Sequence, residues 1–436
     1  MARAGPFTAE RMATVDVSRL ATWLSYPSLI AEFGPESPWS DASAVDTPAA
    51  EPWPEPDRYI SDLRQSFDES VATCIGQHEV VAVALSGGLD SLAVLQSCSK
   101  RAKKDGRRLV AVVAEMIDDS GTTNAVGAWR LVRDLGINCT FLIARRETSP
   151  VGSPEWSARG PRLDALPKVN RLLAELGERA GATVLLTGSG ADELLGAVPY
   201  LLPRRTVMPT LRRFSYLRDT VVTGRRAFVL EMASIGARAL PAYPRAIAYF
   251  AASWPELSRF DVPEVLGARY SEPVREWTRR WVKNTIRFHA AHHSDWATME
   301  AWDAVYPLHH LDSPGPLPLL TPFLEPAFMA IARRLPLESR YDPVHDHAYW
   351  RQKAQVLKLL PSATRLVLPQ AKATYRHELG RSAMPQDLRS MIVCQLGLVR
   401  PEILRKANDP TTRHRVLAIE TWLVGALAYG HDVNSA

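Results

Sequence analysis

Short continuous apolar runs alternate with segments of helical periodicity through the first half of the chain. The runs are rich in Val, Leu and Ala and predict buried strands over residues 79–85, 109–115, 139–144 and 183–187. Around them, apolar residues recur at helical spacing over residues 59–74, 91–100, 123–135 and 167–180. Strands without polar alternation are buried on both faces, and strands that alternate with helices form parallel sheets. The pattern therefore predicts an α/β fold with a doubly wound parallel sheet.

The remainder of the chain lacks such strand runs. After residue 196 the sequence predicts helices broken by prolines, and the aromatic stretch 246–254 is interpreted as helical core. Residues 11–33 predict one or two short amphipathic helices, and residues 34–57 are too rich in proline for helix or sheet. We therefore divide the chain into an N-terminal arm and linker (1–56), an α/β core (57–200) and a mostly helical C-terminal part (201–436).

Composition places the chain among globular proteins. Of 436 residues, 46% are hydrophobic and 23% are charged, which excludes wholesale disorder. No apolar run reaches the length of about 18 residues that a membrane-spanning helix needs. The four cysteines, at positions 74, 98, 139 and 394, have no metal-ligand or redox spacing and are interpreted as reduced core residues. We therefore expect a cytoplasmic protein without a membrane or a secretory signal.

The excess of positive charge is small. The chain has 52 Lys and Arg residues against 47 Asp and Glu, a net charge of +5. Only nine of the 52 are lysines, so a lysine in a suggestive place stands out. Arginine pairs are scattered along the chain with acidic residues between them, which favours a solvated surface over a nucleic-acid partner.

The segment Ser-Gly-Gly-Leu-Asp-Ser at residues 86–91 lies directly after a predicted strand and before a helix. Small residues at such a turn let backbone N–H groups approach an anion, and the helix N-terminus adds unpaired donors and partial positive charge. Asp90 would repel a bare phosphate, so its presence points to a Mg²⁺ ion between it and the phosphates. The motif is neither a Walker loop nor a dinucleotide-binding fingerprint.

A second motif, Gly-Ser-Gly-Ala-Asp-Glu-Leu-Leu-Gly at residues 188–196, follows the last predicted strand. Asp192 and Glu193 could serve merely as acidic residues in a first helical turn. In a parallel sheet, however, both motifs lie at the carboxyl edge, where ligands bind in open α/β folds. Asp192 is therefore interpreted as a second metal-binding acid that faces Asp90.

Together the two motifs resemble the asparagine synthetase-type ATP pyrophosphatase, or PP-loop, family. The resemblance extends to Thr-Pro-Phe-Leu-Glu at residues 321–325 and to segments 349–360 and 368–375. It implies an adenine nucleotide α-hydrolase-like fold, ATP and Mg²⁺ as cofactors, and an AMP-forming carboxylate–amine ligase. Such enzymes convert a carboxylate to an acyl-adenylate with release of pyrophosphate, and an amine then attacks to give an amide.

The resemblance also assigns residues to the nucleotide. The group expected to hold the pyrophosphate comprises Ser86, Gly87, Gly88 and Ser91. The group expected to line the adenosine site through its backbone comprises Leu85, Ala114, Met116 and Gly188.

The residues expected to act on the reacting phosphates are charged. Asp90 and Asp192 would bind Mg²⁺, and Lys372 matches the lysine that the family directs at the α-phosphate. A cation is needed there because negative charge grows as the carboxylate attacks. Arg351 or Lys353, on the preceding helix, is expected to contact pyrophosphate.

Three departures from the family shape the expected function. The region before residue 57 is too short for the family's glutaminase half, so we expect the amine to come from the substrate, from free ammonia or from a partner protein. Ser189 stands where relatives have Glu or Tyr, which leaves the general base unassigned. Pro318 and Leu320 replace an acid and an arginine that precede the family's Pro-Phe-Leu-Asp segment, which argues against a small aspartate pocket.

These departures favour lactam or macrolactam formation in natural-product biosynthesis, as in lasso-peptide or β-lactam pathways. The substrate would be a small-molecule or peptide carboxylate, with room for a partner protein or a peptide-delivering subunit. The alternative is intermolecular amide formation with ammonia or a second amine. A tRNA-modifying enzyme and a non-catalytic binding module are the remaining hypotheses.

Other candidates for chemistry are weaker. The histidines at positions 289, 292, 293, 309, 310, 345 and 347 are interpreted as surface or core residues, because no carboxylate or cysteine set accompanies them. Trp302 and Tyr306 either line an acceptor pocket or belong to a helical core.

Overall fold

The computed structural model describes residues 14–26, 38–39, 51–57, 63–145, 160–161, 167–202, 210–305, 316–361, 367–375 and 384–434. Its centre is a five-stranded sheet in the order β4-β3-β2-β5-β6, and every pairing in it is parallel. The strands are β2 (Val80–Ala84), β3 (Arg108–Ala114), β4 (Thr140–Ala144), β5 (Val184–Leu186) and β6 (Leu319–Leu320). The predicted doubly wound parallel sheet is therefore confirmed.

Alternate residues of the strands face two separate cores, because successive side chains point to opposite sides of a sheet. Val81 and Val83 of β2 pack with α2 (Leu63–Ile75), α3 (Leu89–Asp105) and α4 (Asn124–Asp134) on one face. Ala82 of the same strand packs on the other face, with Leu173 and Ala174 of α5 (Pro167–Arg179). Burial on both faces explains why these strands read as unbroken apolar runs.

The four strands expected from the apolar runs lie within one residue of their predicted ends, or slightly inside them. The expectation that strands stop after residue 196 is wrong, because β6 joins the main sheet beside β5 and β7 (Asp432–Asn434) pairs with β1 (Thr14–Asp16). These strands have only two or three residues each. Elements this short leave no periodicity in a sequence, and their pairing depends on tertiary contacts.

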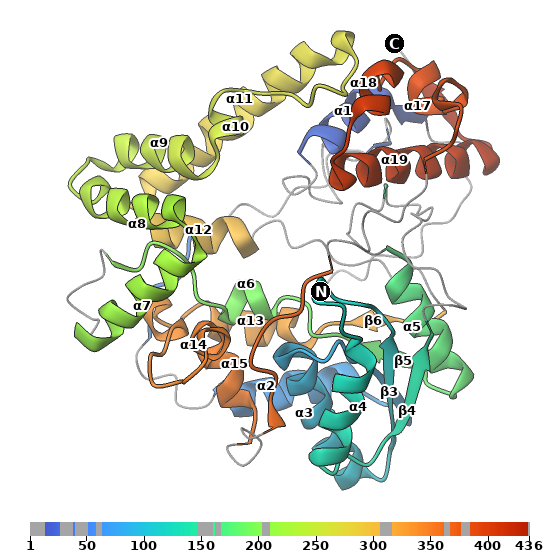
Figure 1. Cartoon of the computed structure of the whole chain (residues 1–436), viewed down its shortest axis with the longest axis vertical. Coiled ribbons are helices and arrows are strands. Elements are labelled where there is room, and N and C mark those ends of the chain that lie inside the picture. Colours follow the sequence, from blue (N-terminus) through green and yellow to red (C-terminus); the bar gives the residue numbers. More distant parts are fainter. Residues whose placement is uncertain are drawn as a thin grey trace.

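The C-terminal part is mostly helical, as predicted. Figure 1 shows its helices in two groups, one beside the sheet and one extending away from it. The longer helices are α7 (Thr210–Thr223), α8 (Arg225–Ala237), α9 (Ala242–Ser253), α11 (Ala268–Ala291), α12 (Trp296–Val305) and α19 (Pro410–Ala428). The short ones are α6 (Ala191–Leu195), α10 (Pro255–Ser258), α13 (Pro326–Ala332), α14 (Ala348–Gln352), α15 (Ala354–Leu359), α17 (Ile392–Gln395) and α18 (Pro401–Lys406).

The described part of the N-terminal segment belongs to the helical core. Helix α1 (Val17–Ser25) begins at Asp16, whose side chain accepts hydrogen bonds from the N–H groups of Ser18 and Arg19. Leu20 and Leu24 are fully buried, and α1 packs against α11 and α19 near the C-terminal strand (Figure 1). The helix predicted within residues 11–33 is therefore present, while residues 27–33 lie outside the described part.

All four cysteines are free thiols, as predicted, but only Cys74 and Cys98 are buried in the core, and Cys139 and Cys394 are half-buried. Within the part of the chain that the structure describes, no helix is both long and apolar enough to cross a membrane.

Candidate active site

The first loop of the site joins β2 to α3. Gly87 has φ +86°, a left-handed conformation that favours glycine. The hydroxyl groups of Ser86 and Ser91 lie 3.1 Å apart, and the Ser91 hydroxyl accepts the N–H of Ser86 at 3.2 Å. Helix α3 then begins after Gly88, which supplies no side-chain cap, and the N–H of Leu89 reaches the Tyr349 hydroxyl at 3.5 Å. The helix N-terminus that follows directs its N–H groups and partial positive charge toward the loop, as in anion-binding sites.

The second loop joins β5 to α6 and lies directly against the first. A Cβ atom added to Gly188 would come 2.7 Å from the backbone nitrogen of Ser91 and 2.9 Å from the carbonyl carbon of Asp90. Only a glycine permits this approach. Gly190 follows with φ +85° and turns the chain into α6, which carries Asp192 in its first turn. The contact of the two loops is what places Asp192 near Asp90.

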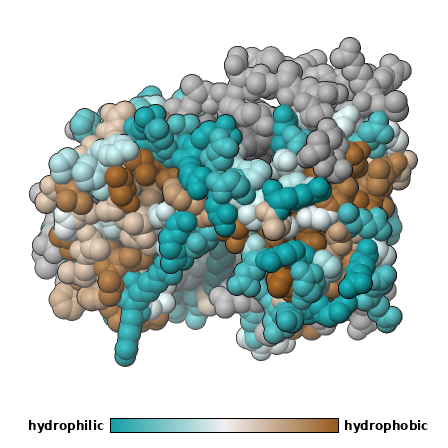
Figure 2. All heavy atoms as spheres, turned by 90° about the horizontal axis from the view of Figure 1, so that it is seen from above, coloured by the Kyte–Doolittle hydropathy of each residue, from teal (hydrophilic) through white to brown (hydrophobic). Residues whose placement is uncertain are grey.

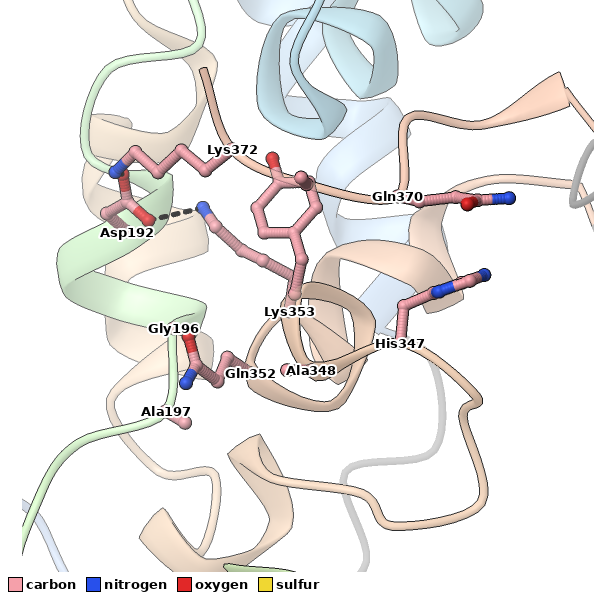
Figure 3. A pocket seen from close by; sticks show the side chains of 11 residues that line it. Asp192, Gly196, Ala197, His347, Ala348, Gln352, Lys353, Gln370 and Lys372 are labelled. Atoms are coloured by element: carbon pink, nitrogen blue, oxygen red, sulfur yellow. Dashed lines mark hydrogen bonds and ion pairs between the residues drawn. The ribbon is translucent and has the colours of Figure 1, made fainter. Parts of the chain in front are cut away.

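The two carboxylates meet at one ammonium group. Lys353 Nζ lies 2.7 Å from both oxygens of Asp90 and 2.5 Å from Oδ1 of Asp192. Lys372 Nζ contacts the other Asp192 oxygen at 3.0 Å. Figure 3 shows both lysines pointing at Asp192, whereas His347 and Gln370 point away from it. The side chain of Lys353 is 4% exposed and that of Lys372 is 61% exposed, so the first is a fixed cation and the second is accessible.

Burial and the lysines set opposite protonation tendencies for the two acids. Burial raises the pKa of Asp90, with the charge of Asp192 adding to it, against the lowering effect of Lys353. Burial also tends to raise the pKa of Asp192. The positive charges of Lys353 and then Lys372 outweigh this effect and hold the pKa of that carboxyl below its usual value. Burial followed by the charge of Asp90 raises the pKa of Tyr349, whose hydroxyl accepts the N–H of Leu89.

A cavity of about 270 Å³ opens at the carboxyl edge of the sheet. It brings together most of the residues expected at the nucleotide, namely Leu85, Ser86, Asp90, Ser91, Ala114, Met116 and Gly188. Sequence reasoning missed Asn124, which also lines it. The Asn124 side chain accepts the N–H of Met116 at 2.8 Å and donates to the carbonyl of Ala114 at 3.0 Å, so it sets the shape of this wall. An asparagine ten residues after the end of β3 carries no motif that would single it out.

A second cavity, of about 550 Å³, lies beyond the carboxylates. Its walls are α6, α14 and the loop that bears Lys372 (Figure 3). The described residues that line it are Asp192, Gly196, Ala197, His347, Ala348, Tyr349, Gln352, Lys353, Gln370, Ala371 and Lys372. Asp90 lines the smaller cavity and Asp192 the larger, so the paired carboxylates lie where the two cavities approach each other.

The sequence predicts a pyrophosphate contact from either Arg351 or Lys353, and the structure gives the two residues different partners. The Arg351 guanidinium forms two hydrogen bonds with Asp219 of α7, at 2.6 and 2.8 Å, and its third nitrogen donates to the carbonyls of His345 and Asp346. Both members of this pair are buried. Arg351 thus anchors α14 to α7, while Lys353 lies where α14 meets α15 and reaches the carboxylates.

The pair of acids suits a Mg²⁺ ion held together with phosphates. Oxygen atoms of Asp90 and Asp192 converge on one cation, and Mg²⁺ in phosphate-handling sites takes one or two carboxylates and completes its shell with phosphate and water. Among the residues placed by the structure, no cluster of three or more His, Cys, Asp or Glu side chains suits a metal. Asp90 and Asp192 are therefore the residues that would hold the ion.

Two of the weaker candidates lie in the helical core, whereas His347 lines the larger cavity. Trp302 is buried in α12 against Phe288 and His289, so it belongs to a helical core, which is one of its two predicted roles. His289 is fully buried and contacts Asp303 at 3.4 Å. Tyr306, His309 and His310 lie outside the described residues. The stretch 246–254 forms most of α9 with Ala246, Tyr249 and Phe250 buried, so its interpretation as helical core is confirmed.

A parallel sheet with an anion-binding βα turn, an acid in each of two adjoining loops and lysines beside them defines an ATP pyrophosphatase of the PP-loop type. Comparison with known proteins agrees. Residues 62–407 match the family model described as "Asparagine synthase". A tRNA(Ile)-lysidine synthase from Leifsonia xyli subsp. xyli (strain CTCB07) is 34% identical over 131 residues, which span 28% of this chain and 39% of that protein.

The family match covers well over half of the chain, so the chain belongs to the asparagine synthase family. This membership supports an ATP-binding site in the chain. The match with the lysidine synthase is confined to a minor part of each protein and supports the shared ATP pyrophosphatase core.

Proposed function

We propose that the chain adenylates a substrate carboxylate and joins it to an amine of the same substrate, giving a lactam or macrolactam. The observation that carries the proposal is the pair of cavities that approach each other at Asp90 and Asp192. The smaller, with its Gly-rich loop, suits the adenosine and part of the phosphate chain of ATP. The larger leaves room for the group that is activated.

Each group of residues in the site has its own role in the proposed reaction. The loop of Ser86 to Ser91 and the N-terminus of α3 bind the pyrophosphate part of ATP, and backbone groups near Leu85 and Met116 hold adenosine. Mg²⁺ on Asp90 and Asp192 would neutralise phosphate charge. The carboxylate oxygen attacks the α-phosphorus and the bond to the β-phosphate breaks, so pyrophosphate leaves. Lys372 is accessible and mobile enough to follow the charge on the α-phosphate, while buried Lys353 stays on the pyrophosphate side.

The size of the larger cavity favours a substantial substrate. Pockets of roughly 300–1,000 Å³ take drug-sized ligands, and this cavity of about 550 Å³ lies in that range. Ammonia with a small amino acid would leave much of it to water. Its described lining contains the lysines Lys353 and Lys372 but no arginine, so it lacks the forked partner that commonly fixes an amino-acid carboxylate.

An external amine is the alternative. The amine would then be ammonia or a second small molecule, and the acyl-adenylate would form in the same way. The larger cavity would then hold both the acyl group and the separate amine.

The test is a screen of carboxylate substrates by pyrophosphate release, with AMP detection to show which phosphate bond breaks. Amino-terminated peptides and β-amino acids are compared with aspartate plus ammonium. The proposal expects release with the former and a product one water lighter than its substrate. Activity with ammonium alone, giving a primary amide, would refute the intramolecular reaction. Formation of ADP and phosphate would refute adenylation.

A further inference from the structure

The positive charge of the chain is concentrated on one segment. Residues 210–253, which form α7, α8 and α9, contain seven arginines and only two acidic residues. Their excess of five positive charges equals the net charge of +5 of the whole chain. Both acids, Asp219 and Glu231, are buried, at 7% and 1% exposure. The sequence predicts a surface on which acidic residues separate the arginines. That prediction is wrong for these helices, because the acids that separate the arginines along the chain point inward.

The same helices expose apolar side chains in stripes. On α7, Phe214, Val221 and Val222 are 77%, 53% and 81% exposed. Their spacing, with the exposed Arg218 between them, places them on one helix face. On α8, Val229 and Met232 are exposed, and on α9, Tyr243 and Ile247 are exposed.

The helices that carry these stripes are neighbours. Helix α8 packs against both α7 and α9, and Figure 1 shows the three helices together at one edge of the molecule. Seen from above in Figure 2, apolar surface gathers on the side where Figure 1 places α8 and α9. Exposed apolar surface gathered in one region commonly marks a protein interface. We call it the α7–α9 face; its apolar members are Phe214, Val221, Val222, Val229, Met232, Leu240, Tyr243 and Ile247.

We propose that the α7–α9 face docks an acidic, amphipathic segment of a partner protein. The apolar stripes need an apolar partner surface, and exposed arginines beside them, among them Arg225 and Arg226, favour carboxylates on it. A second copy of this chain would set these arginines against each other and is disfavoured. A nucleic acid would meet the arginines but leave the exposed Phe214 and Val222 without apolar contacts.

The opposite side of α7 connects this face to the site. Asp219 holds Arg351 of α14, and its Oδ2 also accepts the hydroxyl of Tyr341 at 2.8 Å. Helix α14 continues into Lys353, whose ammonium lies on the two carboxylates. A partner bound to the outer side of α7 is thus one buried ion pair away from the helix that lines the larger cavity, a suitable place from which to deliver a substrate.

The test measures fluorescence anisotropy of a labelled amphipathic peptide with leucines on one helical face and glutamates on the other. The wild-type chain is expected to bind it, more weakly at high salt. Val222→Glu and Arg225→Glu are each expected to weaken binding about tenfold or more. The control is Val424→Glu, an exposed valine of α19, at 50% against 81% for Val222, and this variant is expected to bind as the wild type does.

Any of four results would overturn the proposal. The first is undiminished peptide binding by both α7–α9 variants. The second is equal binding of a peptide with lysines in place of the glutamates. The third is stronger binding of a single-stranded RNA that the same variants abolish. The fourth is a wild-type dimer in sedimentation that Val222→Glu converts to monomer, which would assign the face to self-association.

Discussion

Lys353 holds Asp90 with both carboxylate oxygens at 2.7 Å, although 263 residues separate the two in sequence. The same ammonium reaches Asp192, so one buried cation compensates two acids. This arrangement keeps the two carboxylates together in the absence of a nucleotide. It also means that the lysine competes with any divalent cation for the same oxygens.

Replacing Lys353 by Met tests this competition. The variant leaves two carboxylates without their cation, and we expect the free energy of unfolding at pH 7 to fall by about 2 kcal/mol, less than for a fully buried pair because Asp192 is half exposed. Added MgCl₂ should raise its melting temperature more than that of the wild type. Thermal unfolding with and without MgCl₂ checks this, with Lys358→Met on α15 as control. Equal Mg²⁺ shifts in the variant and the wild type would speak against a metal site at these acids.

Replacing Lys372 by Ala separates chemistry from stability. Its side chain is 61% exposed, so the free energy of unfolding should change by less than about 0.5 kcal/mol. Loss of the cation at the reacting phosphate should lower the rate of AMP formation by about 100-fold or more. Steady-state AMP assays and urea unfolding are the measurements. Undiminished product formation would show that this lysine has no part in the reaction.

Replacing Gly188 by Ala tests the contact of the two loops. The added methyl group would lie 2.7 Å from a backbone nitrogen, so we expect a loss of about 1–3 kcal/mol in stability and weaker ATP binding. Gly127→Ala is the matched control, because that helical glycine of α4 has open space around it and should gain about 0.5–1 kcal/mol. Urea unfolding and nucleotide titration distinguish the two. Tight ATP binding by the Gly188 variant would contradict the close approach of the loops.

The Asp219–Arg351 pair predicts a pH dependence of stability. Burial tends to raise the pKa of Asp219, but hydrogen bonds from Arg351 and Tyr341 outweigh this effect and hold that pKa below its usual value. A lowered carboxyl pKa adds stability above the unfolded value of about 3.9, and this contribution disappears as the pH falls through the folded-state value. Asp219→Asn should therefore lose about 3 kcal/mol at pH 7 and progressively less below pH 4.

Urea unfolding at pH 7 and pH 3 measures this difference. Tyr341→Phe serves as a milder control, since it removes one hydrogen bond to the same carboxylate and should cost about 1 kcal/mol at pH 7. A difference between Asp219→Asn and the wild type that stays constant from pH 7 to pH 3 would show that the carboxylate charge contributes nothing to the pair.

The local sequence pattern was sufficient to predict most of the α/β core. Strands β2, β3 and β5 are buried on both faces and so appear as unbroken apolar runs, whereas the edge strand β4 is an apolar run that is only half-buried. The two Gly-rich loops have small residues where backbone must approach an anion or another loop. Asp90 and Asp192 could be paired because parallel strands bring their carboxyl ends to one edge. Strand β6 escaped prediction because its pairing with β5 involves two residues, too few for any period.

The side chains that complete the site depended on long-range contacts. Arg351 and Lys353 are two residues apart on one short helical segment, and nothing in their spacing tells which one faces the carboxylates. The buried carboxylate of Asp219 decides it, because an unpaired charge at that depth would be costly and the forked guanidinium satisfies both of its oxygens.

The sequence by itself determined the parallel sheet, the order of its central loops and the two acids at its edge, since these follow from periodicity and from residue types that act within a few positions of each other. Only the tertiary structure decided that Lys353 lies on both acids, that Asn124 shapes the wall near Met116, and that the exposed charge on α7 and α8 is entirely positive. The physical reason is that burial and charge compensation arise between segments hundreds of residues apart, where no local pattern reports on them.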